Sequence, residues 1–291
     1  MKLSLKKCLV LLFATLVIAI SSGYDYYALI LSETIVEKAR TRGLVIHFKH
    51  PSLGLMNFKA DRMTINLPQM PVSLPLKNPL IKPVWSELIT LTPAASLTAT
   101  LYGGNLHGLA VYRKDGGIII PTISLSNCQM NLVPQFAGFG VTEGNISLKA
   151  EKLVLENSKL RSGELNIKVA NARKASNSSL PSLLTGLPFD LQLPPFRDLN
   201  LDCKAGLTNA GKLQLNCVLV SSLADVSASG SINTASSNGE LRFKVNLKPD
   251  GQKYAGSYLP IISSGVLSTT DSIFSVLLNG SIYSPRISWK K

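Results

Sequence analysis

The chain has 291 residues, a length that suits one large all-β domain or two ordinary domains. Its apolar content of 45 % is enough to form a core. Its formal net charge of +13 comes from 30 Lys and Arg against 17 Asp and Glu, and only 16 % of the residues are charged. The basic residues are scattered and have no aromatic residues between them, which argues against nucleic-acid binding. This diffuse charge suits an anionic membrane surface, although a merely solvated basic surface is the commoner explanation.

Residues 1–24 have the pattern of a membrane anchor. Lysines precede an unbroken apolar run from Cys8 to Ile20, which is shorter than the about 20 residues of a spanning helix but is not ended by Ser21 to Gly23. We predict a cytoplasmic tip and transmembrane anchor over residues 1–24. The residues expected at the two membrane interfaces are Lys6, Lys7, Tyr24, Tyr26 and Tyr27.

A cleaved signal peptide is the alternative, because Ala19 and Ser21 are small residues at a suitable spacing for processing. Under either interpretation the positive end stays in the cytoplasm and the rest of the chain is exported. Residues 25–43 predict a short helical stalk that continues the anchor, with Gly43 as its C-cap.

Residues 44–291 predict a β-rich domain, because the hydrophobic period changes to two. Leu241–Leu247 alternates strictly between apolar and polar residues, as a half-buried antiparallel strand does. Similar strands are expected at Ser96–Tyr102, Leu106–Arg113, Gly117–Ser126, Asn145–Leu155, Glu164–Ala170, Val226–Ile232 and Ile273–Ile282. Turn signals between strands include Ser162-Gly163, Asn238-Gly239 and Asp250-Gly251.

A weak repeat follows four of the glycines, in the form glycine, polar, apolar, polar, apolar. It reads "GNISLKA", "GELNIKV", "GKLQLNC" and "GELRFKV", starting at Gly144, Gly163, Gly211 and Gly239. Each glycine is expected to end a turn and each strand to present one apolar face, which must cover a core or line a concave surface. Any meander of hairpins would give similar matches. The candidate apolar groove comprises Leu213, Leu215, Leu241, Phe243 and Val245.

Two proline-rich segments interrupt the pattern, at residues 67–88 and 174–197. Proline at this density predicts that neither segment contains a central strand or a helix interior. The second segment predicts an excursion, with one or two helical turns at Leu180–Thr185. Its leucines either contact lipid or a partner, or are buried in an ordinary long connection.

Cys203 and Cys217 occupy the apolar faces of two predicted strands around the loop Asn209-Ala210-Gly211. If that loop pairs Thr208 with Lys212, the two cysteines lie directly opposite each other, with Cα atoms about 4.5 Å apart. An exported domain is exposed to oxidation. We therefore predict a disulfide between them rather than a reduced apolar pair, and expect Cys128 to remain free.

Catalytic and metal-binding patterns receive no support from the sequence. His47, His50 and His107 have no nucleophile and acid in a recognisable order, and the cysteines match no zinc spacing. The acidic residues are spread singly, so they do not indicate a carboxylate pair. We expect no enzyme activity, no cofactor and no metal.

Several of these segments together resemble a known family. They are the anchor, a stalk ending in "KARTRGLVIHF", the turn "LYGGNLHG", the Gly-x-Leu-x-Leu strands and the closing "VLLNGSIYSPRISW". The combination is similar to the N component of bacterial type II secretion systems, a family that resembles the AsmA-like envelope proteins in turn. In the ending, the matching residues are Leu278, Gly280, Ile282, Pro285 and Ile287.

The resemblance implies a transmembrane helix and stalk followed by an elongated, curved antiparallel sheet of successive hairpins. It implies a single-pass bacterial inner-membrane protein with a periplasmic domain, acting without catalysis in protein export across the outer membrane. Its partners would be inner-membrane lipid and other envelope components of the secretion system. The AsmA-like connection implies an alternative, in which an apolar β-groove binds phospholipid acyl chains and conveys lipid between membranes.

Overall fold

The structure, a computed structural model, describes residues 26–41, 44–54, 57–67, 72–84, 92–113, 117–156, 159–180, 191–281 and 285–291. The predicted anchor at residues 1–24, which includes Lys6, Lys7 and Tyr24, lies outside these ranges. Within them, no helix combines the length and the apolar character needed to cross a membrane.

Residues 26–40 form a helix at the position of the predicted stalk. Its inward face follows a spacing of three or four residues, with Ala28 and Ser32 buried and Ile35 half-buried. Beyond its end, the Leu44 N–H donates to the Ala39 carbonyl at 3.0 Å, a bond that commonly closes helices. Gly43, the expected C-cap, lies outside the described residues.

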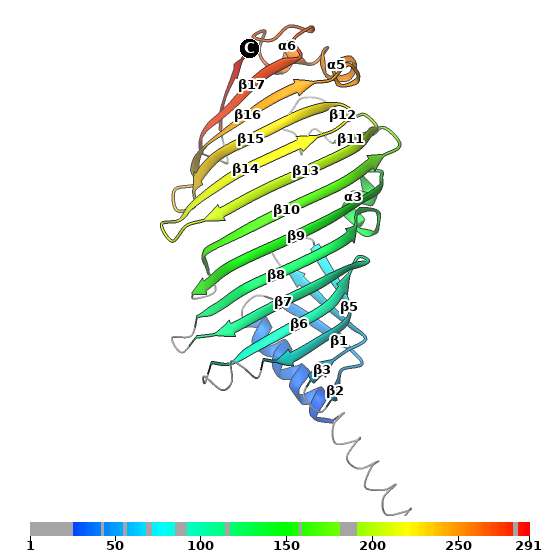
Figure 1. Cartoon of the computed structure of the whole chain (residues 1–291), viewed down its shortest axis with the longest axis vertical. Helices are drawn as coiled ribbons and strands as arrows, with labels where there is room; N and C mark the ends of the chain where they lie inside the picture. The colour runs from blue at the N-terminus through cyan, green and yellow to red at the C-terminus, as the bar shows by residue number, and fades with distance from the viewer. Residues whose placement is uncertain are drawn as a thin grey trace, which may run out of the picture. The chain divides into compact units, whose positions relative to one another are not determined.

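Strands make up most of the remaining chain (Figure 1). They are β1 (Val45–Lys49), β2 (Ser52–Gly54), β3 (Asn57–Lys59), β4 (Arg62–Leu67), β5 (Val72–Pro83), β6 (Ala94–Leu101), β7 (Gly104–Tyr112), β8 (Ile118–Gln129), β9 (Val141–Glu156), β10 (Lys159–Lys174), β11 (Ser178–Leu180), β12 (Leu191–Leu193), β13 (Phe196–Leu207), β14 (Lys212–Val220), β15 (Ala224–Asn233), β16 (Asn238–Leu247), β17 (Ile273–Ser281) and β18 (Arg286–Lys290). Short helical elements are η1 (Met130–Leu132), α3 (Pro134–Gly138), α5 (Pro249–Ala255) and α6 (Leu259–Ile262).

Sixteen strands share one sheet, in the order β1-β4-β5-β6-β7-β8-β9-β10-β13-β14-β15-β16-β17-β18, with β2 and β3 attached to it. Most neighbours are consecutive along the chain, so the sheet is built from successive antiparallel hairpins, as the sequence predicts. Among the described residues β1 and β18 do not pair with each other, so the sheet is not closed.

The chain divides into two compact units, Met1–Leu101 with Leu106–Leu109, and Tyr102–Asn105 with Ala110–Lys291. The sequence predicts a single β-rich domain over residues 44–291. In the first unit, Phe58, Met63 and Leu76 are buried, and the Phe48 ring meets the Phe58 ring edge-on at a centroid distance of 5.2 Å. These side chains form a local core of their own.

The prediction that proline excludes a central strand from residues 67–88 is wrong, because β5 pairs with β3 and β4 and with β6. Pro75 faces Thr64 of β4, in the part of β5 where the pairing with β6 has not yet begun. Pro79 lies at a register shift and uses only its carbonyl, which accepts the Ala60 N–H at 3.1 Å. Proline is tolerated here because no ladder bond needs its missing N–H.

The second unit places alternate connections at the same end of its strands. In an antiparallel meander, the connections β8–β9, β10–β13, β14–β15 and β16–β17 must share one end. Figure 1 shows α3, the β11–β12 hairpin and α5 at this end. We call it the helical end, because three of its four connections carry extra structure.

Two glycines of the sequence repeat do not end turns, contrary to the prediction. Gly144 lies inside β9 with φ 128° and Gly163 inside β10 with φ 156°, each beside a register shift between those strands. Glycine adopts such angles without strain, and irregular pairing of this kind bends a strand. The predicted turn at Asn238-Gly239 is the start of β16, and Asp250-Gly251 lies in α5.

Residues 174–197 contain the predicted excursion. β11 and β12 pair antiparallel as a separate two-stranded sheet between β10 and β13. Most of the helical turn expected at Leu180–Thr185 falls on residues 181–190, outside the described part of the chain. The leucines proposed there as lipid contacts therefore stay a prediction.

Candidate functional site

The sheet of the second unit carries an unbroken row of apolar side chains across nine strands. The row follows directly opposed residues from β8 to β18, and we call it the central row. Its members are Leu125, Leu148, Ile167, Cys203, Cys217, Ala228, Phe243, Val276 and Trp289. All nine are half-buried, so the described chain covers this face only in part.

Further apolar rows flank the central row on the same face. One of them includes Leu201, Leu219, Val226, Val245 and Phe274, each opposed to the next across a strand pair. Because side chains alternate along a strand, residues two positions apart share a face, and the rows merge into one apolar surface. The strands that carry the repeat thus present their apolar residues on one side.

The opposite face is polar and carries exposed ion pairs. Lys149 and Glu151 approach to 2.8 Å, and Lys168 and Asp202 to 3.3 Å. Exposed pairs of this kind contribute little to stability, about 0–1 kcal/mol each. Their role is to keep this face in water, so the two faces of the sheet differ sharply in polarity.

The five predicted groove residues lie on the apolar face, but the structure does not gather them into one cavity. Phe243 and Val245 line an apolar pocket, whereas Leu241 lines a small recess of about 80 Å³ beside Pro285. Leu215 contributes to a pocket with a mixed lining, in which charged and polar side chains of the opposite face predominate, and Leu213 lines none of the pockets described here. All five remain half-buried.

The apolar pocket has a volume of about 530 Å³ and lies where α5 and α6 cover the apolar face of β16, β17 and β18. Its walls include Phe243, Phe274 and Trp289 from the sheet and Tyr254 and Ile262 from the helices. Leu259 and Leu267, 2 % and 1 % exposed, pack with Phe274 to form the core beneath it. The pocket is thus firmly supported.

The helical wall of this pocket is absent from the sequence prediction. The sequence predicts a turn at Asp250-Gly251, whereas the structure has a helix there that begins at Pro249. The informative signals are Pro249 in the first turn, Lys253 in the last turn, and Tyr254, Tyr258 and Ile262 at intervals of four.

A basic pocket of about 720 Å³ adjoins the apolar one at the helical end. Leu223 and Tyr254 line both pockets, so the two share a wall. Four cationic side chains and one carboxylate line the basic pocket: Arg173, Lys174, Arg197, Lys253 and Asp250. The sequence does not predict this cluster, because its members come from two connections that are distant along the chain, β10–β13 and β16–β17.

The connections at the helical end are held together by backbone hydrogen bonds. The Ser222 N–H donates to the Arg197 carbonyl at 3.1 Å, and the Lys248 N–H to the Leu223 carbonyl at 2.8 Å. Gly251 packs against Leu223 so closely that an added Cβ would overlap the Leu223 carbonyl. These contacts place α5 beside the start of β13 and so bring Lys253 to the same pocket as Arg197.

Lys174 is the most deeply buried cation of the pocket, with 2 % of its surface exposed. Its ammonium group donates to the Ser176 carbonyl, and burial lowers the pKa of Lys174. Arg173 lies 3.9 Å from Glu143, and Lys253 lies 3.5 Å from Asp250. Among the described residues no ion pair involves the Arg197 guanidinium, which is therefore available to an anion.

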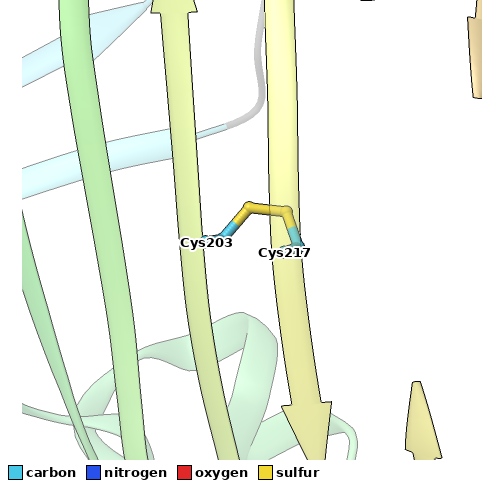
Figure 2. Close-up of a disulfide and its surroundings, with 2 residues drawn as sticks. All are labelled: Cys203 and Cys217. Atoms are coloured by element: carbon cyan, nitrogen blue, oxygen red, sulfur yellow. A yellow bond between two sulfur atoms is a disulfide. The ribbon is translucent and has the colours of Figure 1, made fainter. Parts of the chain in front are cut away.

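Cys203 and Cys217 form a disulfide across β13 and β14 (Figure 2). Cys128 is a buried free thiol, and burial raises its pKa. The pKa of Tyr102 is also raised, first by burial and then by the nearby Cys128. A buried thiol held protonated in this way is a poor nucleophile.

None of the three histidines lines these pockets. His50 Nδ1 is 2.8 Å from Asp61 Oδ2, and both side chains are exposed. No set of three or more potential His, Cys, Asp or Glu ligands gathers within the described ranges. Tyr26 and Tyr27, predicted at the membrane interface, are each 64 % exposed on the helix over residues 26–40.

Comparison of the chain with protein-family models, with curated proteins and with solved structures gives no match.

Proposed function

We propose that this chain binds the acyl chains of lipids on the apolar face of its second unit. The observation that carries the proposal is the central row, nine opposed side chains that stay half-buried and lead to the apolar pocket beside Trp289. No catalytic arrangement competes with it among the described residues. A binding role is therefore the function that the geometry supports best.

The physical argument concerns exposed apolar area. Each Å² of apolar surface removed from water stabilises a complex by about 25 cal/mol, and large contiguous apolar patches are uncommon on proteins without a partner. A saturated hydrocarbon chain is flexible and has no polar groups, so it can follow the rows without leaving a donor or acceptor unsatisfied. The pocket volume also falls in the range of about 300–1,000 Å³ typical of ligand sites.

The test is native mass spectrometry of the full chain extracted in mild detergent. The wild-type protein should carry phospholipid, and Phe243→Asp and Leu213→Asp should lose it, because each places a charge on the apolar face. Lys244→Asp and Gln214→Asp are matched controls, since each changes the next residue of the same strand on the polar face. A lipid-free wild-type protein, or equal loss in the control variants, would contradict the proposal.

A second candidate is the accessory role in type II secretion that the resemblance implies. The segment from β17 to β18 supports it, because Pro285 follows β17, and the resemblance implies a proline that marks the exit from such a strand. The exposed Tyr26 and Tyr27 suit attachment at an inner-membrane surface. Deletion of the gene should impair export of secreted proteins, and normal export of all of them would remove this candidate.

A further inference from the structure

The apolar and basic pockets of the second unit adjoin each other, and together they offer two chemically different halves. Leu223 and Tyr254 belong to both, and the consecutive residues Pro194 and Pro195 line one pocket each. The apolar half is walled mainly by aromatic and aliphatic side chains, and the basic half includes four cationic residues. A ligand that fills both halves must itself be apolar at one end and charged at the other.

The positive charge of the basic half indicates that the polar end of the ligand is negatively charged. Arg173, Arg197, Lys174 and Lys253 stand against the single carboxylate of Asp250. Two of these cations form ion pairs, at 3.9 Å in Arg173–Glu143 and at 3.5 Å in Lys253–Asp250, and Lys174 donates to the Ser176 carbonyl. Both pairs are long and largely exposed, so an anion can compete for the cations.

We infer that this site holds an anionic phospholipid, with an acyl chain in the apolar pocket and the phosphate of its headgroup in the basic pocket. The inference rests on the proposed function and names the class of lipid. Arginine suits a phosphate because its planar fork of N–H donors binds two oxygens at once. Arg197 is therefore expected to make the main contact, with Lys253 beside it.

The preference for an anion arises from the arrangement of the connections. Arg197 is the second residue of β13, Arg173 is the last but one of β10 and Lys253 lies in α5, so the basic half is assembled only at the helical end. A zwitterionic headgroup would bring its own cation into this cluster and lose part of the attraction. An anionic headgroup does not carry this cost.

The test measures binding of two phospholipids with identical acyl chains to the full chain in detergent, by titration and native mass spectrometry. Phosphatidylglycerol is the anionic probe and phosphatidylcholine the zwitterionic one. The wild-type protein should prefer phosphatidylglycerol by about tenfold, which corresponds to a difference of about 1.4 kcal/mol in binding free energy, because only phosphatidylcholine brings a cation into the cluster. The double variant Arg197→Gln/Lys253→Gln should lose this preference, because its affinity for phosphatidylglycerol should fall by more than its affinity for phosphatidylcholine, whose own cation already weakens the attraction to the cluster.

The matched control is Lys204→Gln/Lys212→Gln, which removes two positive charges on the polar face. It should keep the preference, and a loss as large as in the pocket variant would overturn the inference. A second measurement needs no variant. Raising the salt concentration of the wild-type sample should reduce the preference for phosphatidylglycerol, because ions screen the charges. A preference unaffected by salt would also count against the inference.

The outcomes separate the inference from the proposed function. If neither lipid binds, both are wrong. If both lipids bind with equal affinity, the proposed function stands and the anionic site is wrong. Glycerol 3-phosphate serves as a headgroup without chains, and it should not displace phosphatidylglycerol. Displacement at equal concentration would show a site for free phosphate esters, which would overturn the lipid assignment.

Discussion

Cys203 lies directly opposite Cys217 in the pairing of β13 with β14, and the Cα atoms of the two residues are 4.0 Å apart. The disulfide between them belongs to the central row, with Ile167 on one side and Ala228 on the other. It therefore joins two neighbouring strands in the middle of the apolar face. Its position marks the register of β13 against β14, because a slip of one residue between these strands would turn one of the two sulfurs to the polar face.

Removing the disulfide should weaken the second unit moderately. The chain-entropy treatment of a loop of this size gives about 3 kcal/mol, and the local hairpin should reduce that figure. The double variant Cys203→Ala/Cys217→Ala should therefore unfold at a lower urea concentration than the oxidised wild-type protein. Thiol labelling of denatured protein should find two more reactive thiols after reduction than before. Equal labelling would show that the disulfide is absent.

Leu259→Ala should destabilise the cover of the apolar pocket by about 2–5 kcal/mol, because it empties a fully buried site between α6 and β17. Ile261→Ala is the matched control in the same helix, since Ile261 is 63 % exposed, and it should change stability by less than about 0.5 kcal/mol. Urea unfolding followed by tryptophan fluorescence in a Trp85→Phe background, in which Trp289 is the remaining tryptophan, reports this region. Similar midpoints for the two variants would mean that α6 is not packed as described.

Asp271 should make the connection between α6 and β17 sensitive to acid. The Ser268 backbone N–H at 2.7 Å, followed by the Lys291 ammonium at 3.0 Å, holds the pKa of Asp271 below its ordinary value. A lowered folded pKa means that the carboxylate stabilises the fold above its unfolded pKa of about 3.9. That stabilisation is lost as the pH falls through the folded value.

Asp271→Asn should therefore lower the melting temperature at neutral pH, and its difference from the wild type should shrink in strong acid. Thermal unfolding across this range is the measurement. Glu240→Gln, which removes a carboxylate from the exposed pair with Arg242, is the control and should show a smaller change. A difference between Asp271→Asn and wild type that stays constant with pH would rule out this role of the carboxylate.

Gly144→Ala should be costly, by about 1–3 kcal/mol, because an L-residue is strained at its φ of 128°. The new Cβ would also lie 2.8 Å from the Ala172 Cα and the Met130 sulfur. Gly138→Ala in α3 meets no atom within 4 Å, and it should be neutral or stabilise by up to about 1 kcal/mol. Thermal unfolding of the two variants compares them, and equal melting temperatures would contradict the bulge at Gly144.

Strand-scale features of this protein follow from the sequence alone. Strict alternation in Leu241–Leu247 determines which residues of β16 face the apolar side, because side chains of a strand alternate whatever lies around them. The short loop after Thr208 sets Cys203 against Cys217 by counting outward from the turn, which is also local.

Tertiary structure decided the features that depend on neighbouring chains. Pro75 and Pro79 fit into β5 because the pairing of the neighbouring strands requires no N–H at these two positions. Gly144 is needed in β9 because the backbone of Ala172 lies too close for a side chain. The two pockets could not be predicted, since Arg173, Arg197 and Lys253 are distant in the sequence. They meet because alternate connections of an antiparallel meander return to the same end of the sheet, and only the strand order determines which connections those are.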